Sequence, residues 1–144
     1  MKDSAAAIIL WENKILFFHR DNIPTIPDPD CWTLPGGHIE SGETPLQGVT
    51  RELEEEVSFS PKELVFLIKI KGEDKNNYIY CAFVNDDDAK NFKHGIGEGQ
   101  EIGFFTIDEA LKLKLTPILK TGLTKFEKEI KEAMETGIIP KFTL

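Results

Sequence analysis

The chain has 144 residues, of which 40% are hydrophobic and 29% are charged, and these values are ordinary for one globular domain. The formal net charge of -8 excludes the basic surface with which a protein coats a nucleic-acid polymer. Cys31 and Cys81 show neither metal-ligand spacing nor a disulfide framework, so we expect free thiols in a reducing, cytoplasmic compartment. The apolar run at residues 5–11 is shorter than a membrane span and predicts a buried strand.

Two apolar runs, residues 5–11 and 15–19, flank three polar residues, which is the length of a hairpin connection. Arg20 ends the second run, and we expect its side chain to point from the tip of that strand. Residues 21–30 follow, with prolines at positions 24, 27 and 29. Proline fixes φ and cannot join a β-ladder, so this segment predicts a stiff, extended loop. The loop is either a simple connector or the wall of a substrate pocket.

Residues 32–34 predict a short strand, which ends at a glycine turn formed by Pro35-Gly36-Gly37. Adjacent glycines let the backbone approach a ligand or a metal closely. The helix that follows has an N-cap residue, a proline in its first position and a capping box, which are Thr44, Pro45 and Gln47.

The sides of this helix differ in character. At about 100° per residue, the core stripe comprises Leu46, Val49, Leu53 and Val57. Three carboxylates gather at the edge of that stripe, and they belong to Glu52, Glu55 and Glu56. Glu54 lies on the opposite flank, and Arg51 turns further toward solvent. Glycine inside a helix costs about 1 kcal/mol relative to alanine, so Gly48 predicts that another segment packs closely there.

Carboxylates at such short separations repel one another, and each i,i+4 pair on a helix costs roughly 0.2–0.5 kcal/mol. The arrangement favours folding only if a cation lies among them. Hard oxygen ligands suit divalent metals such as Mg²⁺. The sequence therefore predicts a divalent metal site on this helix.

The second half of the chain supplies further elements. Residues 64–70 and 78–84 predict another hairpin, after which Asp86-Asp87-Asp88 is interpreted as a solvated hairpin tip rather than a metal triplet. A glycine-rich loop at residues 90–99 holds Glu98 and precedes a strand at 102–105. Thr106 and Glu109 then cap a short helix.

Residues 116–136 show helical periodicity, and Gly137 ends the helix. The side chains predicted to face inward are Ile118, Leu119, Leu123, Phe126, Ile130 and Met134. Strands and helices do not alternate regularly along the chain. We therefore expect a mixed α/β (α+β) domain rather than a doubly wound parallel sheet.

The central stretch resembles the signature of the Nudix (MutT-like) hydrolase family, G-x5-E-x7-R-E-U-x-E-E-x-G-U, in which U is a bulky aliphatic residue. The matching positions are Gly37, Glu43, Arg51, Glu52, Leu53, Glu55 and Glu56, and Phe59 takes the last hydrophobic position. Ser58 departs from the pattern, because the family has glycine there. Glycine would supply a left-handed residue at the helix end, a conformation that costs serine roughly 1 kcal/mol or more.

The resemblance implies a Nudix-type α/β/α sandwich with a mixed central sheet, in a single domain spanning residues 1–144. It also implies one to three Mg²⁺ or Mn²⁺ ions. The implied ligands are the Gly36 carbonyl and the carboxylates of Glu52, Glu55, Glu56 and Glu98. Arg51, together with Glu52, Glu55, Glu56 and Glu98, forms the implied catalytic set.

Glu43 and Arg51 are implied to be structural, with Arg51 holding the loop or orienting a catalytic glutamate, and a surface ion pair is the alternative. The general base is left open by the resemblance. Some family members use a glutamate of the helix, and others use a loop glutamate that Glu98 matches in Glu98-Gly99-Gln100. Glu101 is a neighbouring alternative, and a solvated loop charge is the plain interpretation of Glu98.

Three residues are candidates for substrate binding, and they are Arg20, Trp32 and Gly37. Arg20 would contact a phosphate or a base, or else be a surface charge. Several aromatic side chains would stack on a base or else belong to the core, and these are Phe18, Trp32, Tyr78, Tyr80 and Phe83.

The predicted function is Mg²⁺-dependent hydrolysis of a diphosphate linkage in a nucleotide triphosphate, oxidised or not, or in another nucleoside diphosphate derivative. The expected partner is therefore a small nucleotide-type diphosphate, with no nucleic-acid polymer and no membrane, and a homodimer is an open alternative. A Nudix-fold binding or regulatory domain without catalysis is the second hypothesis, although we would expect it to lose the carboxylates. A calcium-binding or structural acidic helix is the third, but the chain lacks the D-x-[DN]-x-[DN]-G loop.

Overall fold

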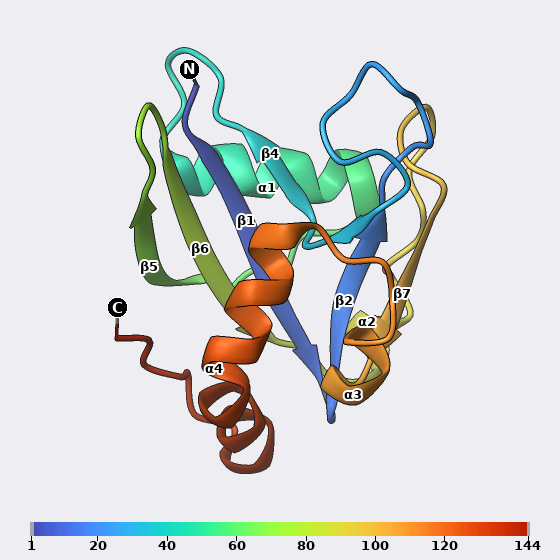
Figure 1. Ribbon diagram of the computed structural model, residues 1–144. Helices are drawn as coiled ribbons and strands as arrows, with labels where there is room; N and C mark the ends of the chain where they lie inside the picture. Colours follow the sequence, from blue (N-terminus) through green and yellow to red (C-terminus); the bar gives the residue numbers. More distant parts are fainter. Residues whose placement is uncertain (1, 144) are drawn as a thin grey trace.

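The computed structural model describes residues 2–143, in which seven strands form one mixed sheet between helices (Figure 1). The elements in chain order are β1 (Ser4–Trp11), β2 (Lys14–His19), β3 (Trp32–Thr33), β4 (Gly36–His38), α1 (Pro45–Val57), β5 (Val65–Lys71), β6 (Asn76–Phe83), α2 (Asp86–Ala89), β7 (Glu101–Phe105), α3 (Ile107–Ala110) and α4 (Pro117–Thr136). Helix α1 covers one face of the sheet, and α4 covers the other (Figure 1). The expected α/β/α sandwich is confirmed.

Strand β1 is the centre of the sheet. It runs parallel to β6 over its length and antiparallel to two other strands, with β4 beside residues 4–6 and β2 beside residues 10–11. Strand β2 continues away from β1 and pairs with β3 and β7. The strand order is β3-β2-β1-β6-β5, so both predicted hairpins, β1–β2 and β5–β6, are present.

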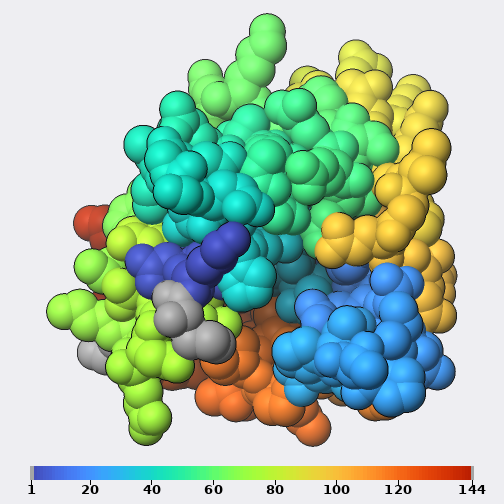
Figure 2. All heavy atoms as spheres, turned by 90° about the horizontal axis from the view of Figure 1, so that it is seen from above, coloured from blue at the N-terminus to red at the C-terminus, as the bar shows by residue number. Residues whose placement is uncertain are grey.

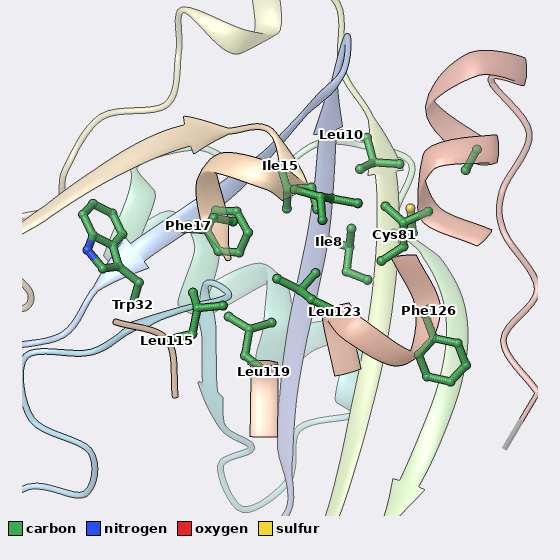
Figure 3. Packing of buried hydrophobic residues seen from close by; sticks show 14 residues of the cluster. Ile8, Leu10, Ile15, Phe17, Trp32, Cys81, Leu115, Leu119, Leu123 and Phe126 are labelled. Atoms are coloured by element: carbon green, nitrogen blue, oxygen red, sulfur yellow. The ribbon is translucent and has the colours of Figure 1, made fainter. Parts of the chain in front are cut away.

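Alternation along β1 explains its continuous apolar sequence, because successive side chains point to opposite faces of a sheet. Ala5, Ala7 and Ile9 pack with the α1 side of the core. Ile8 and Leu10 pack with the α4 side, where Leu119 and Leu123 meet them (Figure 3). Both faces are covered, so the strand carries no polar side.

Two cysteines lie inside this core. Cys31 and Cys81 are both free and buried, as expected. Burial in apolar surroundings raises the pKa of the Cys81 thiol to about 12, so the group stays protonated. Among residues 2–143, no helix is long and apolar enough to cross a membrane.

The glycine turn predicted after residue 34 is wrong, because these residues form strand β4. Gly36 pairs with Ala6 and Gly37 with Ala5. A Cβ on Gly36 would clash with the Ala5 carbonyl oxygen, so only glycine permits this approach. The strand was not recognisable in the sequence, because its partner lies about 30 residues earlier and glycine disfavours strands.

Two residues predicted to face the core are exposed instead. Leu46 is 45% exposed, because it lies in the first turn of α1 and the buried residues of that helix begin only at Gly48, two residues further along. Ile118 is 76% exposed, since it lies about 100° round α4 from the buried stripe that starts at Leu119. The close packing predicted at Gly48 is confirmed, because a Cβ there would lie 3.3 Å from Cγ1 of Ile39.

The aspartate triplet is also not a hairpin tip. Residues 86–89 form the single turn α2, whose first backbone groups are capped by the Asn85 side chain. Asp86 and Asp87 are exposed, as predicted. The helix signals elsewhere are confirmed, with capping boxes at Thr44 and Thr106 and a left-handed Gly137 after α4.

Ser58 takes the left-handed conformation that glycine has in the signature, with φ of 65°. This conformation costs an L-residue about 1–2 kcal/mol. The two last carbonyls of α1 are nevertheless paired, since Val57 accepts from Lys93 N and Glu56 accepts from Gly95 N.

Ser58→Gly is therefore expected to raise the free energy of unfolding by about 0.5–1 kcal/mol, because it removes this cost, and the greater entropy of glycine in the unfolded chain offsets the gain only in part. Denaturant titration measures the change. Ser60→Gly is the control, since its φ is negative, and it should lose stability. Equal effects of the two substitutions would contradict the assignment of strain to Ser58.

Candidate functional site

The site forms where the last turns of α1 pass over β4. The backbone N–H of Gly36 donates to Oε1 of Glu56 at 2.7 Å. Glu56 is only 4% exposed. Burial, together with the charges of Glu52 and Glu98, raises its pKa to about 9, and the Gly36 hydrogen bond only partly opposes this. A buried carboxyl with one protein donor is a group that a cation would stabilise in its ionised form.

Gly37 makes room for a second carboxylate. A Cβ on Gly37 would lie 2.7 Å from Cδ of Glu52, so the side chain of Glu52 occupies the space that any larger residue would need. Burial raises the pKa of Glu52, while hydrogen bonds from Arg51 lower it. The two glycines of β4 thus each face one glutamate of α1.

Arg51 is half-buried, contrary to the prediction that it turns toward solvent. Its guanidinium forms a two-pronged ion pair with Glu43, at 2.8 and 3.0 Å. It also donates to the carbonyl of His38 at 3.0 Å. These contacts keep the pKa of Arg51 raised and that of Glu43 lowered, so both stay charged. Arg51 therefore holds the segment between β4 and α1.

The same guanidinium reaches the acidic face of α1. Nη1 of Arg51 lies 3.0 Å from Oε1 of Glu52 and 3.4 Å from Glu55. Glu55 is half-exposed, with 53% of its side chain accessible, and Glu54 is exposed elsewhere on the helix. Within residues 2–143, no three carboxylate, imidazole or thiol side chains stand close enough to form a ready-made metal cage.

The loop between α2 and β7 adds a further carboxylate. Lys93 and Gly95 donate their backbone N–H groups to the last carbonyls of α1, and this anchors the loop on the helix end. Glu98 is exposed, and its charge contributes to the raised pKa of both Glu52 and Glu56. The fold thus brings Glu98 into the electrostatic neighbourhood of the helix glutamates.

Figure 2 shows a hollow between the loop after β2 (blue), the segment around β4 (cyan) and the loop before β7 (yellow). Pockets of about 360 and 270 Å³ lie elsewhere, beside Trp11 and beside Lys131. The hollow is the candidate site, because β4 and the loop before β7, which border it, carry Gly36, Gly37 and Glu98.

Arg20 does not point from the tip of its strand. Its guanidinium donates to the carbonyls of Pro27 and Asp28, at 2.7 to 3.3 Å, and so holds the proline loop against β2. The sequence does not predict this contact, because its acceptors are backbone atoms. The loop carries neither helix nor strand, as predicted, but it is not extended: residues 24–30 form turns and bends, and Asp30 N donates to the Asp21 carbonyl at 2.9 Å.

Trp32 is a core residue, which was one of its two interpretations. It is 8% exposed, stacks on His19 at a ring-centroid distance of 4.5 Å and meets the edge of Phe105. Phe18 and Tyr80 are buried as well, whereas Phe83 is 37% exposed. Asp21 and His94, which the sequence did not single out, contact the loop of Glu98.

A family model described as NUDIX domain matches residues 1–126 of the chain. The ADP-ribose pyrophosphatase of Methanocaldococcus jannaschii is 34% identical over 109 residues, covering 74% of this chain and 62% of that protein. The 8-oxo-dGTP diphosphatase of Escherichia coli is 47% identical over 79 residues, covering 55% of this chain and 60% of that protein. The matches thus span about three fifths of these relatives' length.

Solved structures agree with the fold. A NUDIX hydrolase from Nitrosomonas europaea superposes with a TM-score of 0.74 at 27% identity, covering 99% of this chain and 76% of that one. A mutT/nudix family protein from Listeria innocua superposes with a TM-score of 0.72 at 22% identity, covering 93% and 96%. These similarities confirm the α/β/α architecture.

The raised pKa of Glu56 predicts how stability depends on pH in EDTA. Because this group is neutral in the folded chain up to about pH 9 and ionises near 4.5 when unfolded, its contribution to stability falls as pH rises between these values. Glu56→Gln keeps the acceptor for Gly36 but cannot ionise. We expect the Tm of Glu56→Gln relative to wild type to increase steadily from pH 5 to 9, as thermal denaturation would measure. Parallel profiles would contradict the assignment.

Proposed function

The chain belongs to the Nudix family, and from this premise we propose that it hydrolyses a diphosphate linkage in a nucleotide triphosphate or another nucleoside diphosphate derivative, with Mg²⁺ or Mn²⁺ as cofactor. The observation that carries the proposal is the meeting of Glu52 and Glu56 of α1 with the two glycines of β4. The names of the relatives, an ADP-ribose pyrophosphatase and an 8-oxo-dGTP diphosphatase, support this class of substrate.

The donor set fits a divalent metal of the Mg²⁺ type. All candidate ligands are oxygens, and the buried Glu56 has only one protein donor where a cation would complete its environment. The residues proposed to hold the metal are Glu52, Glu55, Glu56, the Gly36 carbonyl and Glu98. Arg51 contacts Glu52 through Oε1 alone, so the other oxygen of Glu52 can bind a metal while this pair persists. Arg51 contacts both oxygens of Glu55 at 3.4 Å, so metal binding requires Glu55 to turn from it.

When bound, the metal would neutralise phosphate charge and lower the pKa of a water molecule. The protein then has three tasks of its own. Arg51 orients Glu52 and anchors the segment after β4 through Glu43. Glu98 accepts a proton from the attacking water, with Glu101 or a helix glutamate as the alternative base. Gly37 leaves the space that the side chain of Glu52 occupies.

Charge distribution supports a metal-bridged substrate. Both arginines are engaged within the protein, Arg20 with loop carbonyls and Arg51 with glutamates. An acidic site with no free guanidinium among residues 2–143 would repel a bare diphosphate. A phosphate group held through divalent cations escapes that repulsion. The cofactor and the substrate class are therefore parts of one proposal.

Glu55→Gln and Glu56→Gln are each expected to lower kcat by roughly 100-fold or more, because each removes a charge that the metal needs. Glu54→Gln is the matched control, since it makes the same chemical change on the exposed flank of α1, and it should keep wild-type turnover. Steady-state phosphate release measures all three. Wild-type rates for both Glu55→Gln and Glu56→Gln would refute the proposed metal site.

Metal removal is the second test, and a substrate panel makes it informative. We expect EDTA to abolish phosphate release from ADP-ribose, from 8-oxo-dGTP and from other nucleoside diphosphate derivatives, and excess Mg²⁺ to restore it. Turnover that persists in EDTA would contradict the mechanism. Binding of panel members without turnover under any metal would instead identify a non-catalytic Nudix domain.

A further inference from the structure

The peptide group that joins Glu98 to Gly99 is held from both sides by side chains. Its carbonyl oxygen, which belongs to Glu98, accepts from Nε2 of His94 at 2.9 Å. Its N–H, which belongs to Gly99, donates to Oδ2 of Asp21 at 3.1 Å. A peptide group is planar, so fixing both of its polar atoms fixes the direction in which the chain leaves Glu98.

His94 approaches from within the same loop. Its Nε2 lies 2.9 Å from the Gly99 carbonyl as well as from that of Glu98. Both partners are acceptors, so Nε2 must carry the proton. The next residue, Gly95, donates to the Glu56 carbonyl, so His94 is itself anchored to the end of α1.

Asp21 approaches from the proline loop, 78 positions away in sequence. Its own carbonyl accepts from Asp30 N at 2.9 Å, which ties the beginning of that loop to its end. Gln100 reinforces the junction, because its Nε2 donates to the Arg20 carbonyl and to Oδ1 of Asp30, both at 2.8 Å. The position of Glu98 thus depends on the proline loop.

Gly99 leaves the peptide group little freedom to move elsewhere. Its φ is +76°, a conformation that side-chain-bearing residues rarely adopt. A Cβ on Gly99 would clash with the ring of Phe18, which is 3% exposed and therefore rigidly packed. The backbone at Gly99 therefore packs against Phe18 of the core, while the side chains of Asp21 and His94 bind its polar atoms.

We propose that Asp21 and His94 are positioning residues, which hold the Glu98–Gly99 peptide so that the Glu98 carboxylate faces the acidic end of α1. This inference rests on the proposed function, since it assigns Glu98 a place in that reaction. It also gives the proline loop a task beyond walling the hollow: the loop carries one of the two groups that orient Glu98.

The test compares truncated with conservative substitutions. Asp21→Ala and His94→Ala should each lower kcat by about 10- to 100-fold while KM changes by less than about threefold. Asp21→Asn keeps an acceptor oxygen and His94→Gln keeps a donor nitrogen, so both should recover kcat to within about threefold. Two controls should keep wild-type kcat. Asp87→Ala removes the same charge from an exposed position, and Ile96→Ala truncates a fully exposed side chain in the loop that carries His94.

A double-mutant cycle with Glu98→Gln separates positioning from general stabilisation. If Asp21 acts through Glu98, Asp21→Ala should lower kcat by less than about twofold in the Glu98→Gln background. An equal loss in both backgrounds would overturn the inference. So would wild-type kcat in both Asp21→Ala and His94→Ala.

Amide hydrogen exchange tests the contact without reference to activity. The Gly99 N–H should exchange at least about tenfold faster in Asp21→Ala than in wild type and stay protected in Asp87→Ala. Unchanged exchange would show that Asp21 does not hold this peptide. Absence of turnover in wild type itself would overturn the proposed function, whereas an active wild type with unaffected Asp21→Ala and His94→Ala would overturn only this inference.

Discussion

The contact between α1 and the backbone of β4 is the constraint on which the rest of the site depends. Gly36 donates its N–H to the buried carboxyl of Glu56, and the side chain of Glu52 occupies the space beside Gly37 that a Cβ would need. The missing side chain of Gly37 leaves room for Glu52, and that of Gly36 lets β4 lie against β1. The pairing of β4 with β1 holds that strand in place. Removing water from Glu56 raises its pKa, and this stored electrostatic cost is what a divalent cation would relieve.

Arg51 makes this concentration of negative charge compatible with folding. One guanidinium pairs with Glu43 on the preceding loop and with Glu52 and Glu55 on the helix. It also holds the His38 carbonyl at the end of β4. The guanidinium therefore fixes the strand-to-helix connection and balances the charge of two glutamates.

Loops that are remote in sequence complete the site. The loop before β7 is anchored to the last carbonyls of α1, and the proline loop is held by Arg20 and by Gln100. The two meet at the Glu98–Gly99 peptide. In this arrangement hydrogen bonds join the loop that borders the hollow to the loop that carries Glu98, so the backbone at Glu98 is held by both loops.

Local signals determined much of this protein. Capping boxes at Thr44 and Thr106, the apolar runs of β1 and β2, and the spacing of Glu52, Glu55 and Glu56 depend on neighbours within one or two turns. The sequence alone therefore predicts α1, α3 and α4, the hairpins and the acidic face, but not the single turn α2. Tertiary structure decided the rest. Strand β4, the half-buried position of Arg51, the core position of Trp32 and the contact of Asp21 with Gly99 all depend on partners 13 to 78 positions away, and often on backbone atoms that every residue carries. Composition and periodicity do not identify such partners, because only the folded chain brings them together.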